Sequence, residues 1–249
     1  DLRPAYLAAA KRVEQEVGAS GFQLSLEALA AVNTFPCHES QLLRLAEDTA
    51  LAGDHERICQ IARERRLAFW PGQEGAWLLR WHLIETVCRL ILTARKIREE
   101  VKASPRIPEL LVRRYCEGEA SWCIIDTLHR HLERQYAAFD LAPYADHERL
   151  QRLVELGRRE YMEAIGAMAE AFSSALEGKD FDCGGVARQT AVFATHVQPS
   201  GQQEEKTAFI LVDALRFEMA RELLEGLHDR FAVDLVPVLA MLPTITPVG

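Results

Sequence analysis

The sequence lacks the cysteine patterns that would indicate a metal scaffold or a disulfide-bonded protein. None of its six cysteines stands in a CxxC pair, the spacing typical of structural zinc sites. It shows neither a secretory signal pattern nor the small, cysteine-dense composition of disulfide scaffolds. We therefore predict reduced thiols and a cytoplasmic protein.

The sequence also lacks an uncharged apolar run long enough to cross a membrane. Its most apolar stretch, residues 77–94, is interrupted by Arg80, His82, Glu85 and Arg89 and predicts a buried core helix. We expect no membrane partner. The net charge of −8 argues against a protein whose whole surface binds nucleic acid, because phosphate binding depends on clustered lysine and arginine.

The two ends of the sequence lack the usual marks of a complete protein. The chain begins with Asp1 instead of methionine and ends on the turn-like stretch "MLPTITPVG", residues 241–249. A chain of 249 residues allows one large domain or two ordinary ones. We expect this chain to be a segment of a longer protein.

Residues 1–178 predict a helical domain. Apolar side chains recur every three or four residues in the segments 77–101, 122–136 and 148–177, and each pattern puts one apolar stripe on a helix. At about 1.5 Å per residue, the last segment predicts a helix roughly 43 Å long. The helices differ in length and pattern, which favours an irregular helical domain over a regular solenoid.

The composition changes after residue 178. Residues 179–206 predict a loop or linker, since they include a polar stretch with proline, serine and glycine. Within this region "VARQTAVFATHV", residues 186–197, fits either a helix or a strand.

Residues 207–249 predict the first βαβ unit of an α/β domain. The short apolar run 208–212 predicts a buried strand, a helical pattern follows, and the valine-rich run 231–241 predicts a second strand. This order implies a parallel sheet covered by helices. Because two strands are not stable alone, we expect most of this domain to lie beyond Gly249.

Two polar segments follow the two predicted strands. Asp213 comes directly after the first, and Thr244 and Thr246 come after the second. Ligands bind at the carboxyl ends of the strands of open parallel sheets, so this pattern is compatible with part of a metal and nucleophile site. Other interpretations also fit: Asp213 is a favoured N-cap residue before a helix, and the threonines are common in turns.

The neighbouring charges have a simpler interpretation. Arg216 and Glu218 fall in the first turn of the predicted helix, where an exposed charged face is the default.

The basic stretches 63–66 and 95–102 give a further hypothesis, direct nucleic-acid binding by the helical region. Such charge runs are usually solvated helix faces.

"FILVDALRFEMA" and "LPTITPVG" together resemble the opening of a PglZ domain. This family belongs to the alkaline phosphatase superfamily and occurs in bacterial phage-defence systems of the BREX and phage-growth-limitation type. The upstream stretches "LAFWPG", "CEGEASWCIID" and "GRREYMEAIGAMAEAF" are similar to the helical region that precedes PglZ domains.

The resemblance implies a set of site residues. By position, Asp213 is a metal ligand, and Thr246 is the nucleophile and also a metal ligand. Thr244 is the alternative nucleophile, and Arg216 and Glu218 are supporting residues. The cofactors implied are two divalent metal ions, with zinc as the expected metal. Their remaining ligands would come from later strands.

The function implied is that of a metal-dependent phosphoesterase or phosphodiesterase in anti-phage defence. Its partners would be other proteins of the defence system, with nucleic acid or a nucleotide as a candidate substrate. This chain alone would lack a complete active site. The alternative is a helical interaction scaffold that docks other members of the defence complex without catalysis.

Overall fold

The computed structural model describes residues 3–139, 147–179, 182–200 and 206–240. The chain forms two compact units, each built from two separate stretches of sequence. The first combines residues 1–99 with 128–166, and the second combines residues 100–127 with 167–249. The predicted boundaries at residues 178 and 207 stay a prediction.

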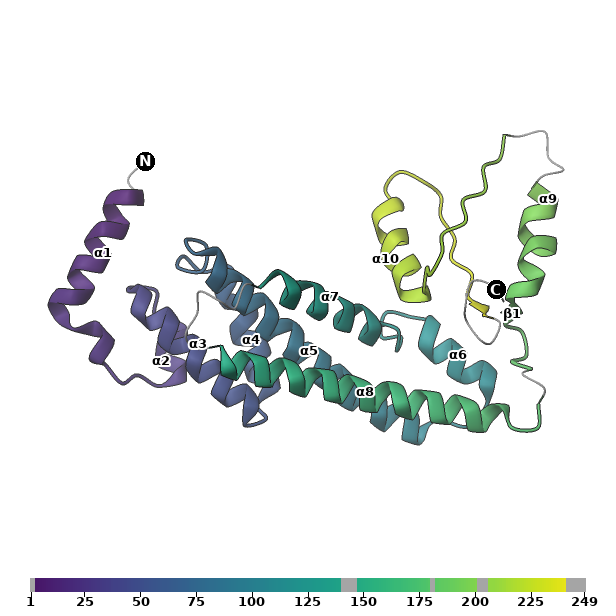
Figure 1. The fold of residues 1–249 in the computed structure, drawn as a ribbon, viewed down its shortest axis with the longest axis horizontal. Helices are drawn as coiled ribbons and strands as arrows, with labels where there is room; N and C mark the ends of the chain where they lie inside the picture. Colours follow the sequence, from purple (N-terminus) through teal and green to yellow (C-terminus); the bar gives the residue numbers. More distant parts are fainter. Residues whose placement is uncertain (1–2, 140–146, 180–181, 201–205, 241–249) are drawn as a thin grey trace. The chain divides into compact units, whose positions relative to one another are not determined.

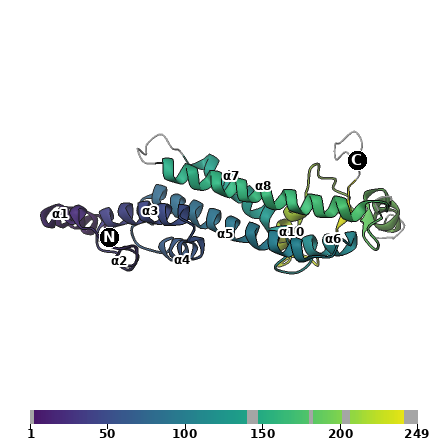
Figure 2. The same cartoon turned by 90° about the horizontal axis from the view of Figure 1, so that it is seen from below.

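The first unit is helical throughout its regular structure. α5 and α8 continue from it into the second unit, and α7 starts in the second unit and ends in the first (Figures 1 and 2). Its helices are α1 (Arg3–Val17), α2 (Leu26–Ala31), α3 (Pro36–Leu51), α4 (His55–Arg65), α5 (Gly75–Ala103), α7 (Ile124–Ala138) and α8 (Glu148–Leu176), with a 3-10 turn at Ala19–Gly21.

α5 forms the centre of the core, as its apolar stripe predicted. Trp81, Ile84, Cys88 and Ile91 are fully buried. In this unit α8 runs alongside α5 in both views (Figures 1 and 2), and the two helices meet closely at Gly157. A Cβ atom at Gly157 would lie 3.2 Å from Val87 Cγ1, tighter than ordinary van der Waals contact. Glycine therefore allows the close approach of α8 to α5.

Buried carboxylates join α3 to its neighbours. Glu39 accepts hydrogen bonds from Arg65 of α4 and from the indole nitrogen of Trp81. Glu47 accepts from Arg80, with Nε–Oε1 at 2.5 Å and Nη2–Oε2 at 2.7 Å. Each fully buried carboxylate is thus paired, which is the condition for keeping a charge inside a protein.

The basic stretch at residues 63–66 is engaged in ion pairs. Arg65 is buried against Glu39, while Arg63 and Arg66 both contact Glu85 of α5. Arginines that are neutralised by neighbouring carboxylates offer less charge to phosphate groups. These contacts favour a structural role for this stretch over nucleic-acid binding.

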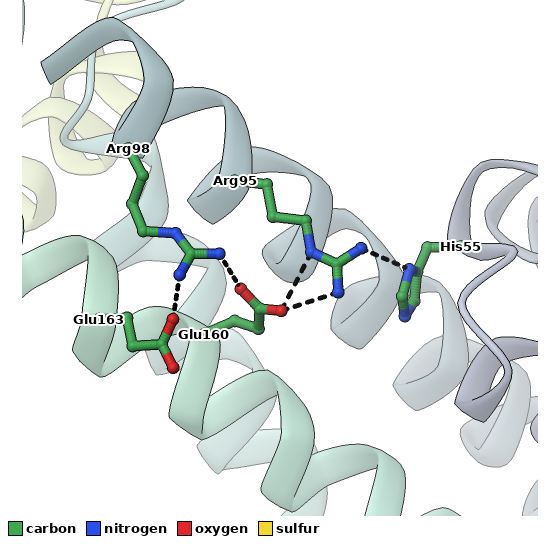
Figure 3. A network of polar contacts seen from close by, with 5 residues as sticks. All are labelled: His55, Arg95, Arg98, Glu160 and Glu163. Atoms are coloured by element: carbon green, nitrogen blue, oxygen red, sulfur yellow. Dashed lines mark hydrogen bonds and ion pairs between the residues drawn. The ribbon is translucent and has the colours of Figure 1, made fainter. Parts of the chain in front are cut away.

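A network of polar contacts links α4, α5 and α8 (Figure 3). Glu160 accepts from Arg95 Nη2 at 2.8 Å and also from Arg98, which in turn contacts Glu163. Arg95 Nη1 lies 3.5 Å from Nδ1 of the buried His55. The two arginines of the basic stretch 95–102 that appear in Figure 3 are therefore held by carboxylates of α8.

The surroundings of His55 predict that stability falls at mildly acidic pH. Burial, and then the Arg95 charge, lower the pKa of His55 below its ordinary value of 6.5. Below pH 6.5 the unfolded chain takes up the proton more readily than the folded one, so acid favours unfolding. The stability is complete above pH 6.5 and declines as the pH falls toward the folded pKa.

Replacing His55 with asparagine should flatten this pH dependence. We expect the unfolding free energy of the unmodified protein to fall by up to about 1.4 kcal/mol per pH unit through His55, and the variant to lose that contribution. Urea unfolding between pH 7.5 and pH 5 measures the slope. The matched control is His228→Asn, at an exposed histidine. Equal slopes in all three proteins would contradict the prediction.

The second unit adds a short parallel sheet to its helices. β1 (Ala187–Arg188) pairs with β2 (Val238–Leu239), with Ala187 opposite Val238 and Arg188 opposite Leu239. Besides the ends of α5, α7 and α8, its helices are α6 (Pro108–Cys116), α9 (Gln198–Ser200) and α10 (Phe217–Leu227), with a 3-10 turn at Gln189–Ala191 and a π-helical turn at Phe193–Val197. The predicted fold class, mainly helical with a parallel sheet near the C-terminus, is confirmed.

The position of the first strand was predicted wrongly. Residues 208–212 have no regular secondary structure, and the large side chains from Phe209 to Val212 are between 51% and 97% exposed. A strand needs a hydrogen-bonded neighbour, and no paired strand at 208–212 occurs in the described ranges. The first strand of the observed pair instead lies at Ala187–Arg188, inside the region predicted to be a linker.

The ambiguous stretch 186–197 proves to contain both kinds of structure, a two-residue strand followed by helical turns.

Cys183 is buried, and all six cysteines are free thiols. No helix within the described part of the chain combines the length and the apolar character needed to span a bilayer.

Candidate functional site

Asp213 lies in an exposed turn that leads into α10. The turn includes Ala214, which has a left-handed backbone with φ of 55°. α10 begins at Phe217 with Arg216 as its N-cap. The interpretation of Asp213 as the N-cap is therefore wrong, since three residues separate it from the first residue of the helix.

Thr244 and Thr246 lie outside the described residues, as do Pro243 and Gly249. Their predicted proximity to Asp213 stays a prediction. The segment that leads to them contains β2, whose pairing with β1 is parallel. Asp213 itself follows a segment without regular secondary structure, so it does not stand at a strand end as expected.

Glu218 differs from its sequence-based prediction, which placed it on an exposed charged face. Its side chain is 1% exposed, and its Oε1 lies 2.7 Å from Nη2 of Arg216, whose own side chain is 55% exposed. The prediction failed because the first turn of α10 packs against α6 instead of facing solvent: the Phe217 and Tyr115 rings lie 6.4 Å apart.

Tyr115 and Asp126 form a part-buried contact beside this turn that the sequence did not single out. The Tyr115 hydroxyl donates to Asp126 Oδ2 at 2.8 Å. Burial raises the pKa of Tyr115 far above its ordinary value, and the carboxylates of Asp126 and Glu218 raise it further. Tyr115 therefore stays protonated and acts as a hydrogen-bond donor at physiological pH.

Arg221, one turn along α10 from Glu218, is a second residue that the sequence analysis missed. Its guanidinium donates to Ser121 Oγ and, at 2.8 Å, to the Gly118 carbonyl oxygen, and lies 3.6 Å from Cys123 Sγ. All three partners belong to the loop 117–123 between α6 and α7. One sequence feature pointed to this loop: the stretch "CEGEASWCIID" is similar to the helical region that precedes PglZ domains.

The carboxylate of Asp213 can act as an oxygen ligand of a metal ion. An exposed carboxylate suits a divalent metal such as zinc. Within the described ranges, no group of three or more His, Cys, Asp or Glu side chains is placed to hold a metal ion. A metal at Asp213 would thus need further ligands from residues other than those the structure describes.

The comparisons with known proteins agree with the motif. Residues 192–249 match the BREX system PglZ alkaline phosphatase-like domain. The chain is also 31% identical over 137 residues to the "Alkaline phosphatase-like protein PglZ" of Bacillus cereus (strain H3081.97). That match covers 53% of this chain and 16% of the relative, so the chain spans only a small part of that protein's length. No solved structure matches the chain. The resemblance to the PglZ family is confirmed.

Proposed function

Because the chain is similar to PglZ proteins and its residues 192–249 match their alkaline phosphatase-like domain, we propose that it is part of a metal-dependent phosphodiesterase of phage defence. The observation that carries the proposal is the exposed Asp213 carboxylate within the matched segment, next to the motif "DALRFE". In this proposal Asp213 is a metal ligand and Thr246 is the nucleophile and also a metal ligand. Thr244 is the alternative nucleophile, and Arg216 and Glu218 support the turn.

The residue types suit phosphoryl transfer. Two divalent metal ions, zinc or a similar metal, would activate a hydroxyl and stabilise charge on the phosphate oxygens. The Thr246 oxygen would attack phosphorus as it loses its proton, and the bond to the leaving oxygen would break as that oxygen gains a proton. Water would then displace the threonine oxygen from phosphorus, which restores Thr246 and releases the phosphate product. Nucleic acid or a nucleotide is the proposed substrate class.

Metal binding by Asp213 is the direct test of this proposal. We expect the full-length protein to retain zinc or manganese after dialysis, and Asp213→Ala to weaken metal affinity by at least about tenfold, because loss of ligand-supporting contacts alone costs about 10–100-fold. Competition with a chromogenic chelator measures the affinity. Asp234→Ala, at another exposed carboxylate, is the control. Equal metal affinity of the Asp213 variant and the control would contradict the assignment.

The scaffold alternative is favoured by one observation, the apolar side chains exposed on α1. Tyr6, Val13 and Val17 are each between 42% and 49% exposed on this helix. Membership of a BREX system implies other defence proteins as partners, and a helical surface of this kind suits docking. The scaffold interpretation is favoured if the full-length protein captures purified components of its system through this helix, yet neither holds metal nor hydrolyses phosphodiesters.

A further inference from the structure

The loop 117–123 between α6 and α7 is closed at its base by a backbone hydrogen bond. Cys123 N donates to Tyr115 O at 3.1 Å. This bond places Cys123 beside Cys116, which follows Tyr115 in the chain. Two free cysteines from opposite ends of the loop are thus neighbours in the folded protein.

The hydrogen bond limits the distance between the two cysteines. Standard peptide dimensions put the Cys116 Cα atom about 2.8 Å from the Tyr115 oxygen, and the Cys123 Cα atom about 1.5 Å from its own nitrogen. With 3.1 Å between that oxygen and that nitrogen, the two Cα atoms lie at most about 7 Å apart. The Cα atoms of disulfide-bonded cysteines usually lie about 4.4–6.8 Å apart. The backbone therefore allows a disulfide between Cys116 and Cys123 without a large movement.

The two thiols also lie close to one guanidinium, that of Arg221 in α10. Burial, and then the neighbouring Cys123 thiol, raise the pKa of Cys116 to about 12, while the charge of Arg221 opposes the rise. Arg221 Nη1 lies 3.6 Å from Cys123 Sγ, which is also 3.3 Å from Ser121 Oγ. The helix α10 therefore covers the cysteine pair through Arg221.

The two thiols differ in their access to small molecules. Cys123 is 1% exposed. Cys116 is half-buried and lines a hollow of about 180 Å³ together with Val186 and Val236. Since a water molecule occupies about 30 Å³ in the liquid, a small oxidant such as hydrogen peroxide fits this hollow. An oxidant therefore reaches Cys116 first, and Cys123 is the thiol that must be uncovered.

We propose that Cys116 and Cys123 are an oxidation site, which forms a disulfide when α10 leaves the loop 117–123, and that this disulfide in turn weakens the binding of α10. The Cys116 thiolate attacks one oxygen of hydrogen peroxide, the O–O bond breaks and hydroxide leaves, which gives a sulfenic acid. The Cys123 sulfur then displaces the hydroxyl group from that sulfur and forms the S–S bond. In total the two thiols lose two electrons and two protons, and one peroxide becomes two molecules of water.

Binding of α10 slows this reaction, because it keeps the thiols covered and protonated. The thiolate is the reactive form of cysteine, and burial is the largest cause of the raised pKa of Cys116, with the Arg221 charge a smaller, opposing cause. Release of α10 uncovers Cys123 and removes part of that burial. In the disulfide, Cys123 no longer offers a thiol to Arg221. Because the coupling of two equilibria is reciprocal, a helix that opposes the disulfide is itself weakened by it.

Oxidation of the full-length protein with hydrogen peroxide tests the first part of the proposal. Free thiols are then blocked with N-ethylmaleimide, and peptide mass spectrometry quantifies the cross-link between Cys116 and Cys123. We expect this disulfide to form about tenfold faster or more in Arg221→Ala than in the unmodified protein, because α10 opens more often. Arg230→Ala, at an exposed residue after α10, is the charge-matched control and should match the unmodified protein. Absence of the cross-link in Arg221→Ala, or equal rates in the two variants, would overturn the proposal.

Hydrogen exchange of the α10 amides tests the second part, in the full-length protein with Arg221 in place. After complete oxidation we expect these amides to exchange about tenfold faster or more, and dithiothreitol to restore the original rate. Cys116→Ser cannot form the disulfide and is the matched control, in which peroxide should leave the exchange of α10 unchanged. Unchanged exchange in the oxidised unmodified protein would overturn the effect on α10. An equal acceleration in Cys116→Ser would also overturn it, because another oxidation would then be the cause.

Discussion

Replacing Thr246 with alanine is expected to lower the rate of phosphodiester hydrolysis by the full-length protein on the order of 10³-fold. The expectation follows from the proposed covalent step, since no other atom of the residue can form the bond to phosphorus. Because Thr246 is also a proposed metal ligand, the variant is compared at saturating zinc or manganese, where the effect should fall on kcat. Hydrolysis of bis(p-nitrophenyl) phosphate in zinc or manganese buffer measures it.

Two further variants separate the threonines. Thr246→Ser keeps a hydroxyl and should retain most of the activity, and Thr244→Ala should change the rate far less than Thr246→Ala does. If Thr244→Ala were inactive and Thr246→Ala active, the nucleophile would be Thr244. Full activity in both alanine variants would contradict a threonine nucleophile in this segment.

Replacing Glu47 with alanine is expected to destabilise the protein by about 3–5 kcal/mol. The Glu47 side chain is 0% exposed and Arg80 is bound to both of its oxygens. Loss of the carboxylate leaves the buried guanidinium without this counter-charge. Chemical unfolding monitored by circular dichroism measures the change in the free energy of unfolding.

The adjacent residue offers a matched control. Asp48 forms an ion pair with Arg149 at 2.7 Å, but its side chain is 53% exposed, so Asp48→Ala should cost about 1 kcal/mol or less. The double variant Glu47→Leu/Arg80→Met removes both charges together and should be much less destabilised than Glu47→Ala. Equal destabilisation by Glu47→Ala and Asp48→Ala would contradict the role given to burial.

The long helices could be predicted because their apolar spacing is a local property. The pattern at 148–177 corresponds to α8 at Glu148–Leu176, and the pattern at 77–101 corresponds to α5 at Gly75–Ala103. The strand at 208–212 could not be predicted in the same way, because an apolar run forms a strand only where a partner strand pairs with it. The pair that forms joins Ala187 to Val238, residues far apart in sequence.

The candidate site was predictable in part, for a related reason. The motif at Asp213 is contiguous, so its resemblance to PglZ domains was visible in the sequence, and the family comparison agrees. The burial of Glu218 and the contacts of Arg221 depend on Tyr115 and the loop 117–123. No local sequence pattern specifies that α10 packs against α6. The charged residues at the start of α10 therefore predicted a solvent-exposed face, although this face contacts α6.

The discontinuous second unit has a consequence for the order of events on the ribosome. Ser121 is synthesised 100 residues before Arg221, its partner in the folded protein. At roughly 5–20 residues per second, this separation corresponds to a delay of about 5–20 s. During that interval the first unit can already form up to residue 166, whereas Ser121 and Cys123 wait for the helix that covers them. Until α10 has been made, a chaperone or an oxidant can therefore reach the side chains of the loop 117–123 that Arg221 contacts in the folded protein.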